Sequence, residues 1–227
     1  MTINLFTTFH KDKNEARMQE LIYCLGRNLN AEFTRIYLIC DNQHDQHYLW
    51  NEVEPKLNVK QGEIYALTIN EGRRATFNDF FFLANRFSTG SDTISVICNS
   101  DIFFPELETL KTFMQHLEDK ENTCLALSRW DINESGQSVH FNRADSQDTW
   151  VFYGNVKISM PIDFGMGVAG CDNRLAHELS ISGYRVLNPS KHIKTIHFHP
   201  SGVRNYIDAS GNVKERIPPP YLLVNPY

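Results

Sequence analysis

One short segment, residues 93–104, constrains the fold of this chain more than any other. It reads TISVICNSDIFF, so the apolar run Thr93–Cys98 is followed at once by Asn99, Ser100 and Asp101. A short run rich in β-branched residues is typical of a strand buried on both faces, as in a parallel sheet covered by helices. Ligands of open α/β sheets bind beyond the carboxyl ends of such strands. Asp101 is therefore the first candidate ligand for a divalent cation, and the alternative is that it caps the next helix.

Predicted strands and helices alternate along most of the chain. Residues 3–9 predict a first strand, and a helix predicted at 15–29 leads to a second strand at 35–40, which favours a parallel, right-handed crossover. Further strands are predicted at 63–69, 93–98, 124–128, 149–153, 184–187 and 193–198, and further helices at 76–87, 107–117 and 174–182. The polar segment 133–146 is predicted as a loop. We expect one α/β domain over residues 1–227, with a mainly parallel central sheet and helices on both faces.

The composition narrows the possible partners. The net charge of -5 argues against a nucleic acid as the main partner. The five cysteines form no CxxC pair, which suits reduced thiols and a cytoplasmic location. No run approaches the roughly 20 apolar residues of a membrane-spanning helix, and the first residues lack the pattern of a signal peptide. We therefore expect no transmembrane segment.

Polar residues also follow the first two predicted strands. Thr8 and Phe9 stand at the end of the first strand, and Asp41 comes directly after the second. Arg73 and Arg74 precede the next predicted helix. Two guanidinium groups beside a helix N-terminus suit a diphosphate, and the alternative is a solvated basic turn.

Several short motifs follow one another in a characteristic order. They are Asn99-Ser100-Asp101, Gly170-Cys171-Asp172-Asn173 at the start of a helix, Gly183-Tyr184, and His197 to His199. Their order resembles that of the nucleotide-sugar-dependent glycosyltransferases with the GT-A fold. Members of that superfamily carry an acidic motif after a central strand, often a second at the start of a later helix, and in some cases a histidine near the end of the core.

The resemblance implies a Rossmann-like domain that binds a nucleotide sugar. Its nucleotide-binding half would span about 1–104 and its acceptor and catalytic half about 105–200, followed by a tail at 201–227. The residues expected to contact the nucleotide diphosphate are Thr8, Phe9, Asp41, Arg73, Arg74, Asn99 and Ser100. UDP is the usual nucleotide of the family, and the sequence leaves GDP and dTDP open.

The resemblance also implies a Mn²⁺ or Mg²⁺ ion that neutralises the leaving diphosphate. The motif departs from the usual pattern because its first position is Asn99, whose amide adds no charge at a metal. Asp101 is then the one motif carboxylate, and a histidine would complete the ligand set. His197 and His199 alternate along a predicted strand, so only one is expected to reach the metal. His199, nearer to the strand end, is preferred.

A general base is the second requirement of sugar transfer to a hydroxyl. Asp172 stands at the expected position, at the start of a helix, and corresponds to the usual base of inverting members. The alternative is that it is a plain helix N-cap. Asp148, beside Trp150, is the competing candidate, and Asp131 is a third.

The sequence thus predicts a metal-dependent glycosyltransferase of the hexosyl- or deoxyhexosyltransferase class. It would move a sugar from a UDP-sugar donor to a hydroxyl of a glycan or glycoprotein acceptor, and inversion is preferred because Asp172 offers a base. One alternative is a non-catalytic nucleotide- or carbohydrate-binding module, which Asn99 keeps open. Another is a sugar nucleotidyltransferase, against which the glycine-free loop after the first predicted strand counts.

Overall fold

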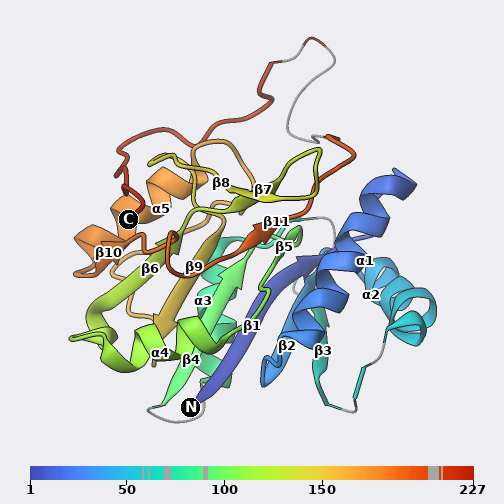
Figure 1. The fold of residues 1–227 in the computed structure, drawn as a ribbon, viewed down its shortest axis with the longest axis horizontal. Coiled ribbons are helices and arrows are strands. Elements are labelled where there is room, and N and C mark those ends of the chain that lie inside the picture. Colours follow the sequence, from blue (N-terminus) through green and yellow to red (C-terminus); the bar gives the residue numbers. More distant parts are fainter. Residues whose placement is uncertain (58, 61, 69–72, 89–91, 204–209, 211) are drawn as a thin grey trace.

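A seven-stranded sheet forms the centre of the protein (Figure 1). The structure is a computed structural model that describes residues 1–57, 59–60, 62–68, 73–88, 92–203, 210 and 212–227. In spatial order the strands are β10 (Arg185–Leu187), β6 (Thr123–Leu127), β9 (Thr149–Tyr153), β4 (Thr93–Cys98), β1 (Thr2–Phe9), β2 (Arg35–Cys40) and β3 (Ile64–Thr68). Strand β9 runs antiparallel to both of its neighbours, and the other pairs are parallel. The predicted mainly parallel sheet is confirmed.

Helices cover both faces of this sheet, as predicted. Helices α1 (Glu15–Asn30) and α4 (Glu108–His116) pack their apolar residues into one core, together with α2 (Gln43–Tyr48) and the helical turn η1 (Leu49–Val53). The turn η2 (Glu54–Lys56) follows η1 and has no buried residue. Helices α3 (Phe77–Phe87) and α5 (Cys171–Ile181) bury theirs in the core on the other face, and η3 (Lys120–Asn122) precedes β6. All five cysteines are buried and free, in agreement with the expected reduced thiols. Within the described residues, no helix is both long and apolar enough to cross a bilayer.

A second, four-stranded sheet lies toward the end of the central sheet that is opposite the N-terminus (Figure 1). Its order is β5 (Ile102–Phe103), β11 (Ile196–His197), β7 (Trp130–Ile132) and β8 (Ser138–His140). The prediction of a loop over 133–146 was wrong in part, because β8 lies within it and pairs with β7 as a hairpin. The strand predicted at 193–198 is shorter than expected, and only Ile196–His197 pair with neighbours.

The capping of two helices settles two open alternatives. Helix α4 has Leu107 as its N-cap residue, so Asp101 does not cap it. Helix α5 begins at Cys171, earlier than the predicted 174, and its N-cap is Gly170. Asp172 therefore lies inside the first turn of α5 and is not the N-cap.

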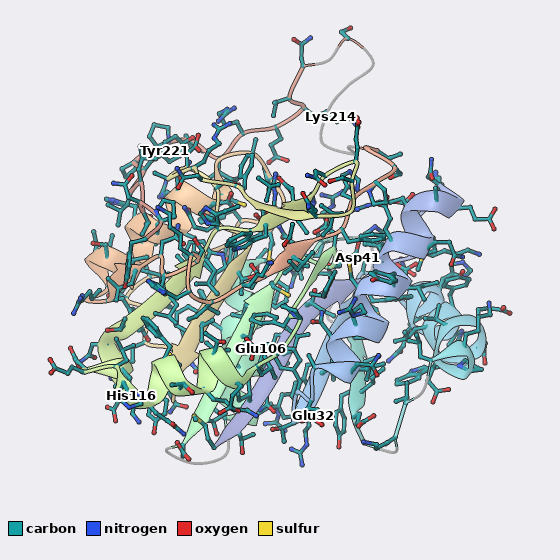
Figure 2. All side chains as sticks on the ribbon, in the orientation of Figure 1. Glu32, Asp41, Glu106, His116, Lys214 and Tyr221 are labelled. Atoms are coloured by element: carbon teal, nitrogen blue, oxygen red, sulfur yellow. The ribbon has the colours of Figure 1, made fainter. Side chains whose placement is uncertain are left out.

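Gly170 is required by both its backbone angle and its surroundings. Its φ is +81°, and an added Cβ would lie 2.8 Å from Tyr221 Oη and 2.9 Å from the Ile217 carbonyl oxygen. Figure 2 shows Tyr221 beside α5. Gly170→Ala should lower the free energy of unfolding by about 2–3 kcal/mol, because left-handed strain and a steric clash add together.

Gly167→Ala is the matched control for this substitution. Gly167 has nearly the same φ, +80°, but an added Cβ would meet nothing within 4 Å. It should cost only about 1 kcal/mol of backbone strain. Urea unfolding of both variants measures the difference, and equal losses would show that the contacts of the 217–221 segment contribute nothing.

Candidate functional site

The carboxylate of Asp101 is at the centre of a buried charge network. Asp101 follows β4, and its Oδ2 accepts a hydrogen bond from Arg17 Nη2 at 2.6 Å and lies 3.4 Å from His197 Nε2. Burial alone would raise the pKa of Asp101, but the hydrogen bond from His197 and the charges of His197 and Arg17 hold it well below its ordinary value. Asp101 is therefore ionised throughout the physiological pH range.

His197 lies between two carboxylates. Its Nε2 faces Asp101, and its Nδ1 is 2.7 Å from Asp131 Oδ1. Burial would lower the pKa of His197, but the hydrogen bonds to Asp101 and Asp131 raise it to about 9. When protonated, His197 donates a hydrogen bond from Nδ1 to Asp131 and forms an ion pair with Asp101 through Nε2.

The second histidine lies outside β11, and its ring is beside that of His197, with the centroids 5.5 Å apart, but it faces Glu20 rather than Asp101. His199 Nδ1 is 2.9 Å from Glu20 Oε2 and 2.5 Å from Arg17 Nη1. The structure thus places His197 beside Asp101, where the sequence had favoured His199. The reason is the pairing of β11 between β5 and β7, which sets His197 opposite both Ile102 and Asp131.

Arg129 connects this network to a second pair of carboxylates. It directly follows Ser128 at the end of β6, and it donates from Nε to Asp131 Oδ1 at 2.9 Å and from Nη1 to Asp148 Oδ2 at 3.1 Å. The other oxygen of Asp148 accepts a hydrogen bond from Asn99 Nδ2 at 2.8 Å. This contact explains why position 99 is an amide, since an aspartate there would face the Asp148 carboxylate and repel it.

Asp172 reaches the same region from the first turn of α5. Its Oδ1 is 3.0 Å from Cys171 Sγ. Burial and, next in size, the negative charge of Asp148 raise the pKa of Asp172 from 3.8 to about 7. A carboxyl group that exchanges its proton near neutral pH can act as a general base or acid.

The residues predicted from the first half are less closely grouped. Asp41 lies at the same end of the sheet as the charge network, and Glu32 lies at the opposite end (Figure 2). Burial raises the pKa of Asp41, and the positive charges of His10 and Arg74 act against this. The exposed Arg74 is therefore near enough to Asp41 for their charges to interact.

Two of the predicted nucleotide contacts, Phe9 and Arg73, also make contacts that stabilise the fold. The Phe9 ring is 3% exposed and stacks on Tyr48 with the ring centroids 6.5 Å apart, so it is a core residue. Arg73 donates two hydrogen bonds to Asp79, at 2.5 and 2.8 Å. Asp79 completes the capping box of α3, so Arg73 holds the start of that helix.

Thr8 and Ser100 lie close together in the structure. With Phe9 they line a small internal cavity of about 10 Å³, which holds at most one water molecule. The nucleotide contacts predicted for Thr8 and Ser100 stay predictions.

Three members of the network escaped the sequence reasoning, and they are Arg17, Glu20 and Arg129. Arg17 and Glu20 belong to α1, where their side chains are only 12% and 4% exposed. Both residues stand among the apolar positions of a helix face. A charged residue at such a position indicates a partner of opposite charge, since charged residues are rarely buried unpaired. Arg129 gave the same signal as Asp101, a polar residue just after a buried strand.

Asp101 and His197 are two neighbouring side chains whose chemistry suits a divalent cation. Within the described ranges, no three His, Cys, Asp or Glu side chains are grouped as a complete metal site. The 3.4 Å between Asp101 Oδ2 and His197 Nε2 nevertheless suits two ligands of one ion, since octahedral bonds of about 2.1 Å place adjacent ligands about 3 Å apart. Mg²⁺-type sites commonly take their remaining ligands from water and substrate phosphates. The two residues therefore fit an ion that is completed by a diphosphate.

Comparison with solved structures supports the fold. A mannosyltransferase from Pyrobaculum calidifontis, PcManGT, in complex with GDP-Man and Mn²⁺, matches with a TM-score of 0.53 and 15% identity, over 89% of this chain and 58% of that one. Residues 1–349 of TarS from S. aureus match with a TM-score of 0.50 and 14% identity, over 87% of this chain and 60% of that one. This chain thus spans less than two thirds of either structure. At these identities the likeness shows only that this chain shares a Rossmann-like α/β fold with the two structures.

The sequence comparisons add no family assignment. No protein-family model matches this sequence, and no curated protein matches it either.

Proposed function

We propose that this protein is a glycosyltransferase that moves a sugar from a nucleotide-diphosphate sugar to a hydroxyl group of a carbohydrate or glycoprotein acceptor. The observation that carries the proposal is the position of Asp172. A carboxyl group with a pKa of about 7 lies beside Asp148, at the end of the sheet where Asp101 and His197 converge. Proton removal and stabilisation of a leaving diphosphate are the two requirements of this reaction, and both have suitable residues here.

Asp172 is the better candidate for the base, and Asp148 is its positioning residue. Both oxygens of Asp148 already accept hydrogen bonds, one from Asn99 and one from Arg129. Asp148 is thus held in place by two hydrogen bonds, and its negative charge helps to raise the pKa of Asp172 to about 7. Asp172 then accepts the proton of the acceptor hydroxyl as that oxygen attacks the sugar. A base on the acceptor favours inversion at the sugar carbon.

Asp101 and His197 are the proposed ligands of Mn²⁺ or Mg²⁺. Even with His197 protonated, the carboxylates of the network outnumber its cations. The carboxylates are Glu20, Asp101, Asp131 and Asp148, and the cations are Arg17, Arg129 and His197. A diphosphate would therefore gain little from these residues alone. When bound, a divalent cation supplies neutralisation of the diphosphate charge. Ligation requires His197 to give up the proton at Nε2.

The nucleoside is expected over the ends of β1 and β2, near Thr8, Asp41 and Arg74. UDP is the nucleotide favoured by the resemblance in sequence. The PcManGT structure contains GDP-Man, so GDP-sugars belong in the same test. The non-catalytic alternative rested on Asn99, and the hydrogen bond from Asn99 to Asp148 supports a role for this amide in holding Asp148.

Thermal unfolding with a panel of nucleotide sugars tests the proposal. A donor at 100 times its dissociation constant should stabilise the protein by about 2.7 kcal/mol and raise Tm by about 5–10 °C, and it should do so only with Mn²⁺ or Mg²⁺. Asp101→Asn is the control that should abolish the shift. If no nucleoside diphosphate or its sugar changes Tm with either ion, the proposed function is wrong. Binding without any transfer or hydrolysis would instead favour the binding module.

A further inference from the structure

Arg17 is a cation of the candidate site, only 12% exposed, whose contacts need an explanation. It lies in the first turn of α1, after the N-cap residue Asn14. Its guanidinium bonds to Asp101 at 2.6 Å and to Glu20 at 2.9 Å, and it lies 2.5 Å from His199 Nδ1. A guanidinium can be buried without a large loss of stability only when its charge is paired. Two carboxylates therefore hold one guanidinium, and one of them is the proposed cation ligand.

The two partners of Arg17 differ in how firmly they are held. Glu20 is fixed on both oxygens, because Oε1 accepts a hydrogen bond from the Ser201 amide and Oε2 faces Arg17 and His199. Glu20 is also on the same helix as Arg17, one turn further on. Asp101 comes from a different part of the chain and shares its Oδ2 between Arg17 and His197. Glu20 is thus the permanent counter-ion, and Asp101 is the partner that can be exchanged.

A cation held between Asp101 Oδ2 and His197 Nε2 would compete with Arg17 for the same carboxylate oxygen. The same oxygen, Asp101 Oδ2, would face both a divalent ion and a guanidinium at 2.6 Å, and the two positive charges would repel each other. Arg17 would then have to leave Asp101 while Glu20 keeps it at the site. A diphosphate coordinated to that ion would be the nearest anion, and a guanidinium fork suits phosphate oxygens.

We propose that Arg17 is a diphosphate-binding residue of the donor site, and that its ion pair with Asp101 is the arrangement of the protein without donor. This rests on the proposed function. Occupation of the site exchanges the partners: Asp101 passes from Arg17 to the cation, and Arg17 passes from Asp101 to the diphosphate. No covalent bond changes in this exchange.

The proposal predicts opposite effects of Arg17→Gln on two ligands. Mn²⁺ alone should bind the variant several-fold more tightly than the wild type, because the guanidinium that competes for Asp101 is removed. A nucleoside diphosphate with Mn²⁺ should bind roughly tenfold to a hundredfold more weakly, since a charge-assisted hydrogen bond is lost. A nucleoside without phosphate should bind as it does to the wild type. General damage to the site would weaken all three.

Two further variants complete the experiment. Arg17→Lys keeps the positive charge but lacks the paired N–H donors of the guanidinium, so it should bind the diphosphate with intermediate affinity. It also provides a second measurement if Arg17→Gln fails to fold. Arg27→Gln is the matched control, because Arg27 lies on the same helix but stacks on Phe103 at 4.5 Å and bonds to Tyr23, outside the charge network. It should leave the affinities for Mn²⁺ and UDP or GDP unchanged.

Titration calorimetry with UDP and GDP, and Mn²⁺ binding followed by electron paramagnetic resonance, give the affinities. Unchanged diphosphate binding by Arg17→Gln, or a parallel loss of Mn²⁺ and diphosphate binding, would overturn the role of Arg17 and leave the proposed function standing. Absence of diphosphate binding by the wild-type protein would refute the proposed function and this inference with it.

Discussion

Replacing Asp172 with asparagine should reduce sugar transfer by roughly a hundredfold to ten-thousandfold, the usual contribution of a general base. Asparagine keeps the shape and the acceptor oxygen but cannot take a proton. In the wild-type protein, the rate should rise with pH as Asp172 ionises around pH 7, since its pKa is raised to about 7 by burial and by the charge of Asp148. The variant should lose this rise.

The same substitution should make the protein more stable at high pH. In the unfolded chain Asp172 ionises near its ordinary pKa of 3.8, whereas in the folded protein its pKa is about 7. Below pH 4 Asp172 is protonated in both the folded and the unfolded protein, so its ionisation does not change the free energy of unfolding. Between pH 4 and 7 the folded state keeps a proton that the unfolded state releases, so wild-type stability falls as pH rises and is lowest above pH 7. Asp172→Asn should therefore gain on the order of 2 kcal/mol at pH 8 and nothing at pH 4.

Rate measurements from pH 5.5 to 9 and urea unfolding at pH 4 and about pH 8 check both effects. Asp163→Asn is the control, because Asp163 is an exposed aspartate and its replacement should alter neither the rate nor the stability. If Asp172→Asn retained wild-type activity, Asp172 would be excluded as the base and Asp148 would become the candidate.

Replacing Arg129 with methionine should produce the largest loss of stability in the site. The Arg129 side chain is only 17% exposed and is the hydrogen-bonding cation between Asp131 and Asp148. Its removal leaves buried carboxylate charge uncompensated, which costs about 3 kcal/mol when one partner of a buried ion pair is deleted. Residual activity should also require higher pH, because the charge of Arg129 acts to lower the pKa of Asp172.

Arg143→Met provides a close comparison. Both arginines lie over the ring of Phe141, at 4.2 Å for Arg129 and 5.6 Å for Arg143. Arg143 is 60% exposed and pairs with Asp145 near the surface, so its loss should cost much less stability than the loss of Arg129. Because both arginines contact the Phe141 ring, the difference in stability between the two variants, measured by chemical denaturation, reports the effect of the largely buried ion pairs of Arg129. Similar losses would mean that the buried charges at Arg129 contribute no more than an exposed pair.

Much of the fold could be predicted because strand and helix formation follow local apolar patterns. Three strands, Arg35–Cys40, Thr93–Cys98 and Thr149–Tyr153, begin and end where the sequence predicts. The hairpin of β7 and β8 was missed because its short strands are partly exposed or exposed and lack an apolar run. Its strands are stabilised by pairing with each other and with β11, a contact between segments more than 60 residues apart.

The sequence by itself determined where carboxylates stand at the ends of buried strands, because a strand must end where the apolar pattern stops. It identified Asp101 in this way, whereas Asp172 was identified by its position at the start of a predicted helix and by the resemblance. Only the tertiary structure decided which charges meet. Arg17 reaches Asp101 across 84 residues of sequence, and His197 rather than His199 faces it. Ion pairs depend on distance in space and on burial, and neither quantity can be read from the order of residues along the chain.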